Sequence, residues 1–591
     1  MKKRILLLYI LTAILCVIPL LSACGGEATP TSTATASPTV TTTTTKTATA
    51  TATATPTGSA TPTPTVAPKP EGTFTFATNT LGKEGFVPWI THVTSYEIYG
   101  PVYDALAYRT GTGDYIPSVA ESWEYSTDFK DLTFHLREGI QFHDGWGELT
   151  AEDVKYCWEK VVSANSTATA KSYAQIVESV EIIDPYTLVF HQKQPNIDFA
   201  QFYALYPGYA PILCKKYIET VGAQEANVNP IGSGPYKVVE KRSGDYIKYE
   251  AVDDHWRVVP EFKYLIIKLV PEESTRVAML KTGDIDATII SDSSEAELKE
   301  AGFGIDLWPY GANGLIVFGG LCRPSCTLYK AGYHNTDPWA DIRVREAMSI
   351  AIDRNAINKA LHNNTAEPGR LVHSIPGYKE VEPIPYDPDR ARQLLAEAAA
   401  DGVFTPNAQG GFHFTLVSAP SHPGLPLIAK EAEAVAGYWA EIGITVDIAT
   451  IEYPTYKPKT TKIENVGECY TYRQTFEGTN PFMYLTQLDY ADANWGIRFQ
   501  CEALDILTPM ARAALAELDL VKRDALYREI AQVERDSWLG IPLMNAPYIV
   551  AKNPATVGDW PPDCSSYYYA LEYVRHAVPL NTFRLFDVPL E

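Results

Sequence analysis

LTFHLREGIQFHDGWGELTAEDVKYCWEKVVS, at Leu132–Ser163, is the most informative stretch of this chain. Between Leu132 and Leu136 apolar residues alternate with polar ones, which is the period-two pattern of a half-buried strand. Glu138-Gly139 and Asp144-Gly145 are turn signals, and the pattern between them predicts a second short strand at Ile140–His143. The first half of the stretch is therefore predicted to be a β-hairpin.

A helix start follows the hairpin. Thr150 stands three residues before Asp153, an acidic variant of the capping box that satisfies free amides in the first helical turn. Beyond it, apolar residues recur on one helical face: Val154, Cys157, Trp158, Val161 and Val162. Many folds use a hairpin that feeds an amphipathic helix, so this local structure does not by itself identify the fold.

The amino-acid sequence of the same stretch closely resembles the signature of the bacterial extracellular solute-binding proteins of family 5. That family reads F-x-L-R-x-G-x-x-F-H-D-G, followed by L-T-A-x-D-V. The matching residues here are Phe134, Leu136, Arg137, Gly139, Phe142, His143, Asp144, Gly145, Leu149, Thr150, Ala151, Asp153 and Val154. The family contains dipeptide, oligopeptide, nickel and oligosaccharide receptors of ABC importers, so the resemblance implies a binding protein of this class.

Segments similar to the family continue through the rest of the chain, from about residue 72 to 591. They are Gly72–Ala77, Tyr103–Leu106, Pro117–Trp123, Gly232–Tyr236, Gly283–Ala287, Arg343–Arg354, Asp387–Ala400, Leu526–Ile530 and Ile541–Leu543. Amphipathic patterns predict helices over Asp341–Leu361 and Ile428–Ile442, the second followed by a strand at Ile444–Ile448. This alternation is typical of an α/β sheet. For Arg343, Arg345 and Asp353 we expect solvated or helix-packing ion pairs.

The fold that the resemblance implies is an α/β, two-lobed clamp like that of periplasmic binding proteins of type II, with an extra subdomain. Two crossing strands serve as the hinge, the first of them near Tyr310–Phe318. The expected boundaries are 71–315 for lobe I, with an inserted subdomain at about 96–230, then 316–545 for lobe II and 546–591 for a C-terminal return to lobe I.

The N-terminal segment predicts export and lipid attachment. A basic start at Lys2-Lys3-Arg4 precedes the apolar run Ile5–Leu21, as in a secretory signal over residues 1–23. Leu21-Ser22-Ala23-Cys24 resembles the lipobox of bacterial lipoproteins, which implies lipidation of Cys24. Residues 24–70 are rich in Thr, Pro and Ala and are expected to form a disordered tether. The expected localisation is extracytoplasmic, on the outer face of the cell membrane.

Charge and motifs exclude several classes of function. The 591 residues carry a formal net charge of −22, which argues against nucleic acid or an anionic membrane surface as the main partner. The 11 histidines form no HExxH pair, and no G-x-S-x-G elbow or phosphate loop occurs, so the sequence predicts no enzyme. No His/Cys cluster suggests a nickel or heme site, and we expect no cofactor.

The resemblance also locates a candidate ligand site between the lobes. Dipeptide-type members hold the amino terminus of the ligand with an Asp, and Glu477 stands in that position here. They hold the ligand carboxylate with an Arg in a loop after an earlier strand, but Leu416–Pro423 contains none. Ser418 and His422 lie in this stretch, and a mostly neutral imidazole is a poor replacement for a guanidinium.

Five more residues complete the candidate ligand-binding set: Tyr470, Tyr472, Arg473, Gln474 and Trp495. The aromatic rings could stack on a sugar ring or a ligand side chain, although ordinary packing explains each of them equally well. A peptide is the first expectation for the ligand, with an oligosaccharide or another polar organic solute as the alternative. A role as sensor co-receptor stays open. The expected partners are the ligand and ABC permease subunits, with the receptor itself a monomer.

Seven cysteines remain in the exported body after Cys24: 157, 214, 322, 326, 469, 501 and 564. An odd number leaves at least one free thiol unless chains pair. Cys157 is the expected free thiol because it lies on the apolar helix face. Cys322–Cys326, within the apparent insertion Leu321–Asn335, and Cys469–Cys501 are possible pairs in an exported protein.

Overall fold

The computed structural model divides the chain into two units, Met1–Val66 and Ala67–Glu591. It describes residues 69–90, 98–109, 115–168, 170–196, 210–321, 336–369, 380–419, 427–452, 455–456, 469–474, 504–558, 571 and 574. All of these lie in the second unit. No helix in this described part of the chain is long and apolar enough to cross a membrane. The leader, Cys24 and the tether lie outside the described residues.

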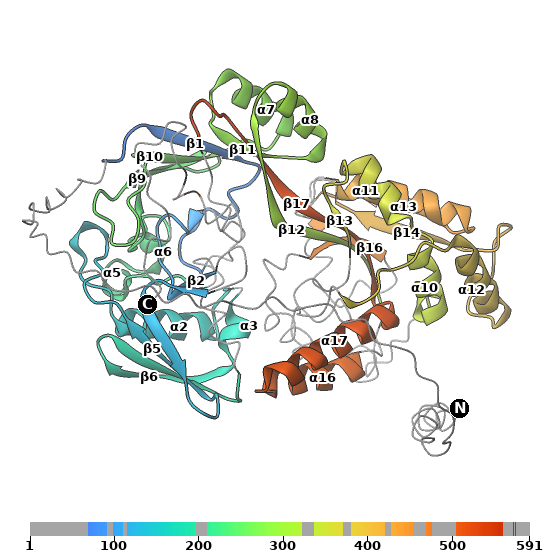
Figure 1. Cartoon of the computed structure of the whole chain (residues 1–591), viewed down its shortest axis with the longest axis horizontal. Helices are drawn as coiled ribbons and strands as arrows, with labels where there is room; N and C mark the ends of the chain where they lie inside the picture. Colours follow the sequence, from blue (N-terminus) through green and yellow to red (C-terminus); the bar gives the residue numbers. More distant parts are fainter. Residues whose placement is uncertain are drawn as a thin grey trace, which may run out of the picture. The chain divides into compact units, whose positions relative to one another are not determined.

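A sheet of 11 strands organises the second unit, in the order β15-β14-β16-β12-β17-β11-β1-β10-β9-β8, with β13 paired to β17 (Figure 1). Its strands are β1 Thr73–Thr78, β8 Tyr236–Arg242, β9 Tyr246–Ala251, β10 Tyr264–Leu269, β11 Ala287–Ile290, β12 Gly304–Phe318, β13 Glu367–Pro368, β14 His413–Ser418, β15 Thr445–Thr450, β16 Cys469–Gln474 and β17 Gly540–Lys552. The two longest, β12 and β17, lie at the centre of this order.

These two strands join the lobes. They pair antiparallel from Gly304 opposite Lys552 to Val317 opposite Gly540, with register shifts between Trp308 and Ala312 and between Asn313 and Leu315. At one end β17 pairs with β11 of the first lobe, and at the other β12 pairs with β16 of the second lobe. The expected two-lobed α/β clamp with two crossing strands is therefore confirmed. The numbered boundaries of the lobes stay predictions.

A separate four-stranded sheet, β4-β5-β7-β6, lies within the predicted inserted subdomain. Its strands are β4 Ala120–Tyr125, β5 Asp131–Leu136, β6 Val177–Asp184 and β7 Thr187–Gln192, and a small hairpin precedes it, β2 Ala107–Arg109 with β3 Tyr115–Pro117. The neighbouring helices are α2 Ala151–Val162, α3 Lys171–Ala174, α5 Lys215–Val221 and α6 Ala223–Ala226. In β5 every second residue from Leu132 to Leu136 is buried, as the alternating pattern predicts.

The second strand predicted for the hairpin is wrong. Ile140–His143 forms only an isolated bridge, between Gln141 and Glu148, and then turns into a short 3₁₀ helix at His143–Gly145. The physical reason is a long-range bond, because the amide of His143 donates to the carbonyl of Gly232 at 2.8 Å. A backbone group that is used in this way cannot take part in a hairpin ladder.

Helix α2 begins as predicted. Asp153 Oδ2 accepts a hydrogen bond from the Thr150 amide at 3.0 Å, which completes the capping box. Val154, Cys157 and Val161 are buried, and Trp158 and Val162 pack partly buried against the same core. The Cys157 thiol is free, as expected.

The remaining helices are α7 Glu273–Thr282 and α8 Asp292–Glu300 in the first lobe, and α10 Ile342–Ile350, α11 Arg354–Leu361, α12 Pro388–Ala400, α13 Ile428–Glu441, α16 Leu504–Ala516 and α17 Leu520–Ser537 in the second. The predicted helix over Asp341–Leu361 is two helices, because Asp353 accepts the Ala356 amide at 2.9 Å and caps a new start. Arg343 forms the expected ion pairs, with Asp341 and Asp401.

The state of Cys469 contradicts the possible Cys469–Cys501 disulfide. Its thiol is free and fully buried in the apolar core between the second-lobe sheet and its helices. Residues Ile316, Phe318 and Leu416 belong to the same core. The side chain therefore packs as a small apolar group, and the Cys469–Cys501 pair is absent. Cys322, Cys326, Cys501 and Cys564 lie outside the described residues.

Candidate functional site

Strands β14 and β16 are parallel neighbours and end at the same edge of the second-lobe sheet. Val417 lies opposite Tyr470, so the carboxyl ends of both strands point the same way. β14 ends at Ser418, four residues before His422, and β16 ends at Gln474, three residues before Glu477. In open α/β sheets ligands bind at the carboxyl ends of the strands. Both predicted ligand segments therefore begin at one edge of the second-lobe sheet.

Tyr470 and Tyr472 lie on one face of this sheet, in a small apolar cluster with Leu315, Val317 and Val417. Both tyrosines are buried, with exposed fractions of 6% and 5%. Helices of the second lobe pack on the opposite face, where Ile316, Phe318 and Leu416 lie. The tyrosines therefore belong to the sheet face that these helices leave uncovered, but in the structure they are packed side chains.

Ser418 lies on the other face. It is 1% exposed, and its Oγ accepts a hydrogen bond from Thr471 Oγ1 at 3.2 Å. Since successive side chains of a strand point to opposite faces, Ser418 points away from the face that carries Val417 and Tyr470. Its hydroxyl already has a partner within the protein.

The other predicted ligand residues fall into two groups. Glu477, His422 and Trp495 lie outside the described residues. Arg473 and Gln474 are described in their backbone, where they stand opposite Gly314 and Asn313 of β12. The ligand-contact roles of all these residues stay predictions.

A row of polar residues in cross-strand register was not predicted from the sequence. Asn313 of β12 lies opposite both Gln474 of β16 and Asn545 of β17, and Asn545 also lies opposite Glu367 of β13. The row lies at the register shift of the crossing strands, next to the carboxyl end of β16. The signal in the sequence was an Asn within each of two apolar strand segments, GANGLIVF and PLMNAPY.

A buried polar cluster around Asp104 explains several signature residues. Asp104 is fully buried, and its Oδ1 accepts from Arg257 Nη2 at 2.9 Å, while its Oδ2 accepts from Ser233 Oγ at 3.0 Å and Trp256 Nε1 at 3.1 Å. Burial by itself would raise the pKa of Asp104, but the Arg257 guanidinium and the bond with His255 hold it well below its usual value. This cluster anchors the GSGPY loop of the first lobe.

His143 holds the same loop. Its Nε2 donates to the Gly234 carbonyl at 2.8 Å, and its ring is buried. Burial lowers the pKa of His143, so the neutral imidazole is favoured at neutral pH. The two signature motifs, F-H-D-G and G-S-G-P-Y, are therefore held together by hydrogen bonds and have a structural role here.

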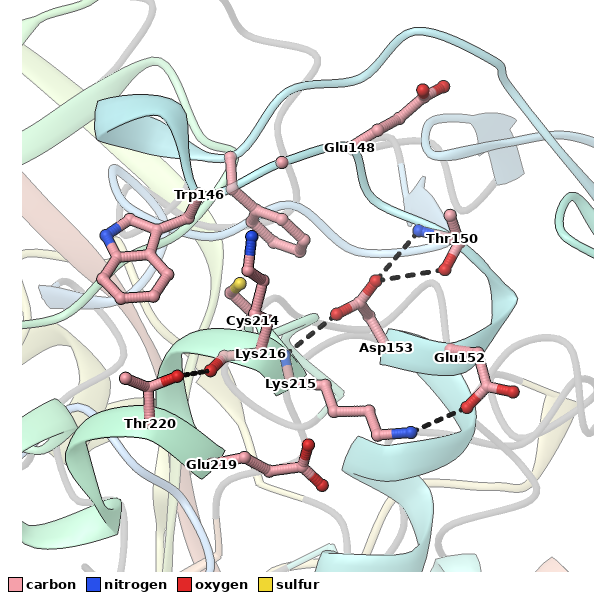
Figure 2. A pocket seen from close by; sticks show the side chains of 12 residues that line it. Trp146, Glu148, Thr150, Glu152, Asp153, Cys214, Lys215, Lys216, Glu219 and Thr220 are labelled. Atoms are coloured by element: carbon pink, nitrogen blue, oxygen red, sulfur yellow. Dashed lines mark hydrogen bonds and ion pairs between the residues drawn. The ribbon is translucent and has the colours of Figure 1, made fainter.

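A hollow of about 480 Å³ opens on the inserted subdomain (Figure 2). Asp153 spans its wall, accepting the Thr150 amide with Oδ2 and the Lys215 amide, at 2.9 Å, with Oδ1. Lys215 Nζ is paired with Glu152 at 2.8 Å. No lining residue belongs to the second lobe, and these central polar groups already have protein partners. We therefore place the candidate ligand site at β14 and β16 instead.

Among the described residues, no group of three or more His, Cys, Asp or Glu side chains could hold a metal ion. This observation covers neither Glu477 nor His422.

The family model "Bacterial extracellular solute-binding proteins, family 5 Middle" matches residues 114–494, which is more than half of the chain. The dipeptide-binding protein of Escherichia coli K12 is 26% identical over 484 residues, covering 77% of this chain and 85% of the relative. Heme-binding protein A of Haemophilus influenzae is 27% identical over 413 residues, covering 66% and 72%.

Solved structures share the fold. The periplasmic binding protein DppA from Helicobacter pylori, in complex with the peptide STSA, has a TM-score of 0.69 at 21% identity, over 86% of this chain and 99% of that one. NikA from Brucella suis, in complex with Fe(III)-EDTA, has a TM-score of 0.71 at 19% identity, over 86% and 100%. At these identities the likeness establishes the fold and leaves the ligand open.

Proposed function

Because the chain belongs to the bacterial extracellular solute-binding proteins of family 5, we propose that it captures a solute between its two lobes and delivers it to an ABC importer. The observation that carries this proposal is the shared edge of β14 and β16, from which the segments with His422 and Glu477 depart. Polar side chains on two adjacent loops can converge on one ligand when both loops start from a rigid sheet.

The ligand that we propose is a peptide. Relatives of this chain are named as dipeptide-binding and di/tripeptide-binding proteins. Glu477 supplies a carboxylate for a peptide amino terminus, one methylene longer than the Asp of dipeptide-type members. A charge-assisted hydrogen bond of this kind is about twice as strong as a neutral one.

One observation favours a second ligand class. Leu416–Pro423 contains no Arg to hold a free carboxylate, so a ligand without one, such as an oligosaccharide or another polar organic solute, is the alternative. The polar row of Asn313 and Asn545 at the crossing strands suits hydroxyl and amide groups of either class.

We further propose that Cys24 is lipidated and that residues 24–70 tether the receptor, as a monomer, to the outer face of the cell membrane. A Thr/Pro/Ala-rich segment cannot bury enough apolar surface to fold, so it would let the body reach a permease beside its anchor. Labelling with radioactive palmitate tests the anchor: incorporation should be lost in Cys24→Ala and kept in Cys157→Ala, whose thiol is buried.

A thermal-shift screen tests the ligand. The protein is heated with di- to pentapeptides, with cello- and xylo-oligosaccharides, and with Ni²⁺. A ligand at 100 times its Kd stabilises the folded state by about 2.7 kcal/mol, which gives a clear rise in Tm. We expect peptides to raise Tm, and the rise to vanish in Glu477→Ala but to remain in Glu433→Ala, which removes an exposed carboxylate on α13.

Sugar hits without peptide hits would overturn the peptide proposal and leave the receptor class standing. A peptide shift that survives Glu477→Ala would show that another group holds the amino terminus.

A further inference from the structure

A buried charged cluster connects the two lobes beside the crossing strands. His362, at the end of α11, lies between two carboxylates: its Nε2 is 2.7 Å from Glu431 Oε1 and its Nδ1 is 3.3 Å from Asp292 Oδ2. The three residues are almost fully buried, with exposed fractions of 2% for His362, 1% for Glu431 and 5% for Asp292.

The cluster draws on both lobes. Asp292 is the first residue of α8 in the first lobe, whereas His362 directly follows α11 and Glu431 lies in α13, both in the second lobe. Helix α8 contacts both β12 and β17, and α11 contacts β17 (Figure 1). The ion pair of Asp292 with His362 therefore links the lobes at the strands through which they are joined.

Two further bonds reinforce this link. Thr365 Oγ1 donates to Asp292 Oδ1 at 2.6 Å, and Asn363 Nδ2 donates to the Asp292 carbonyl at 3.1 Å. Asn363 and Asn364 have positive φ angles of 50° and 61°, a left-handed turn that carries the chain from His362 back towards Asp292. The segment after α11 is thus shaped to hold one first-lobe residue.

The protonation state of His362 decides the strength of the cluster. Burial by itself would lower the pKa of His362, but the hydrogen bond with Glu431 and the charges of Glu431 and Asp292 raise it to about 9. In the described part of the chain these two carboxylates are the charged groups that face the ring. Burial raises the pKa of Glu431, and its Oε2 lies against Gly314 of β12 with no hydrogen-bond partner in the structure. A neutral imidazole would leave two buried carboxylates, one at each ring nitrogen, without a cation between them.

We propose that Asp292, His362 and Glu431 form a clasp across the crossing strands that sets the angle between the lobes and loosens when His362 loses its proton. The clasp would regulate how the two lobes are held. Only its effect on ligand affinity rests on the proposed function. Its test needs no ligand, so its failure would leave the receptor proposal untouched.

Single-molecule energy transfer between dyes on the two lobes tests the clasp. The dyes are attached to unnatural amino acids at Glu159 on α2 and Ala396 on α12, both of which are exposed. We expect Asp292→Asn and His362→Gln at pH 7 to shift or broaden the distribution of transfer efficiencies. Asp401→Asn, which removes the exposed partner of Arg343 within the second lobe, should leave the distribution unchanged.

A pH titration of the protein without these substitutions is an independent test of the clasp. It also tests the role of His362 if His362→Gln fails to fold. Raising the pH from 7 to 10 should reproduce the broadening, with a midpoint near the pKa of about 9. Glu431→Gln should move this midpoint to lower pH, because one of the two carboxylates that hold the proton is gone. An unchanged distribution in Asp292→Asn, or a pH response identical in Glu431→Gln, would overturn the proposal and reduce the cluster to a structural contact.

Discussion

Asp104→Asn should destabilise the first lobe strongly. The carboxylate is fully buried and offers two oxygens to at least three donors: Arg257 on Oδ1, and Ser233 and Trp256 on Oδ2. An asparagine has one acceptor oxygen, so its NH₂ group must face either the guanidinium or the indole N–H. The substitution keeps the shape of the side chain and removes its charge.

The expected magnitude follows from the loss of one partner of a buried ion pair. Arg257 has an exposed side-chain fraction of 12%, so water can compensate little. Removing one partner of such a pair costs about 3–5 kcal/mol. With a urea m-value of about 2–3 kcal/mol/M, the midpoint should fall by about 1–2.5 M.

Urea denaturation followed by tryptophan fluorescence measures this change. Because two lobes need not unfold in one step, amide exchange of residues 232–236 should be followed as well, since Ser233 lies in the cluster. The matched control is Glu152→Gln, which breaks the exposed pair with Lys215, with a Glu152 exposed fraction of 59%, and should cost at most about 1 kcal/mol.

The pH dependence gives a second check. The pKa of Asp104 is depressed in the folded state, so its contribution is present above the unfolded-state value near 3.9 and is lost as pH falls towards the folded-state value. The gap between the unmodified protein and Asp104→Asn should therefore shrink between pH 7 and pH 3. A gap no larger than that of Glu152→Gln, or one that does not change with pH, would refute the reasoning.

Three other predictions concern stability. Gly234→Ala should lower Tm in a thermal melt and reduce the free energy of unfolding by at least about 1–3 kcal/mol, because the added Cβ would lie 2.6 Å from the Val102 carbonyl carbon. The control Gly437→Ala places a Cβ in open space on α13 and should raise Tm. Trp439→Ala should cost about 3–5 kcal/mol in urea, since the ring is fully buried and its Nε1 donates to the Met348 carbonyl at 2.7 Å; Trp439→Phe, which keeps an aromatic ring, should cost less. The raised pKa of His362, about 9, gives stability that is full below the unfolded value near 6.5 and lost as pH rises through 9, so His362→Gln should flatten the fall of Tm between pH 7 and 10.

The sequence by itself determined the local elements and the family. Alternation from Leu132 to Leu136 and the Thr150–Asp153 capping box predicted β5 and the start of α2, because both depend on neighbours within a few residues. The resemblance of the signature residues to family 5 also predicted the two-lobed fold with its crossing strands. The candidate ligand segments with His422 and Glu477 came from the same resemblance, and the structure adds that both start from one sheet edge.

Only the tertiary structure decided what depends on partners far away in the chain. His143 leaves the predicted strand because Gly232 accepts its amide, and the Cys469 thiol packs in a core that strands and helices far apart in the chain form together. The Asn313–Asn545 register and the Asp292–His362 pair likewise join segments that share no local pattern. Burial makes such contacts strong, since an unpaired charge or amide away from water costs far more than an exposed one.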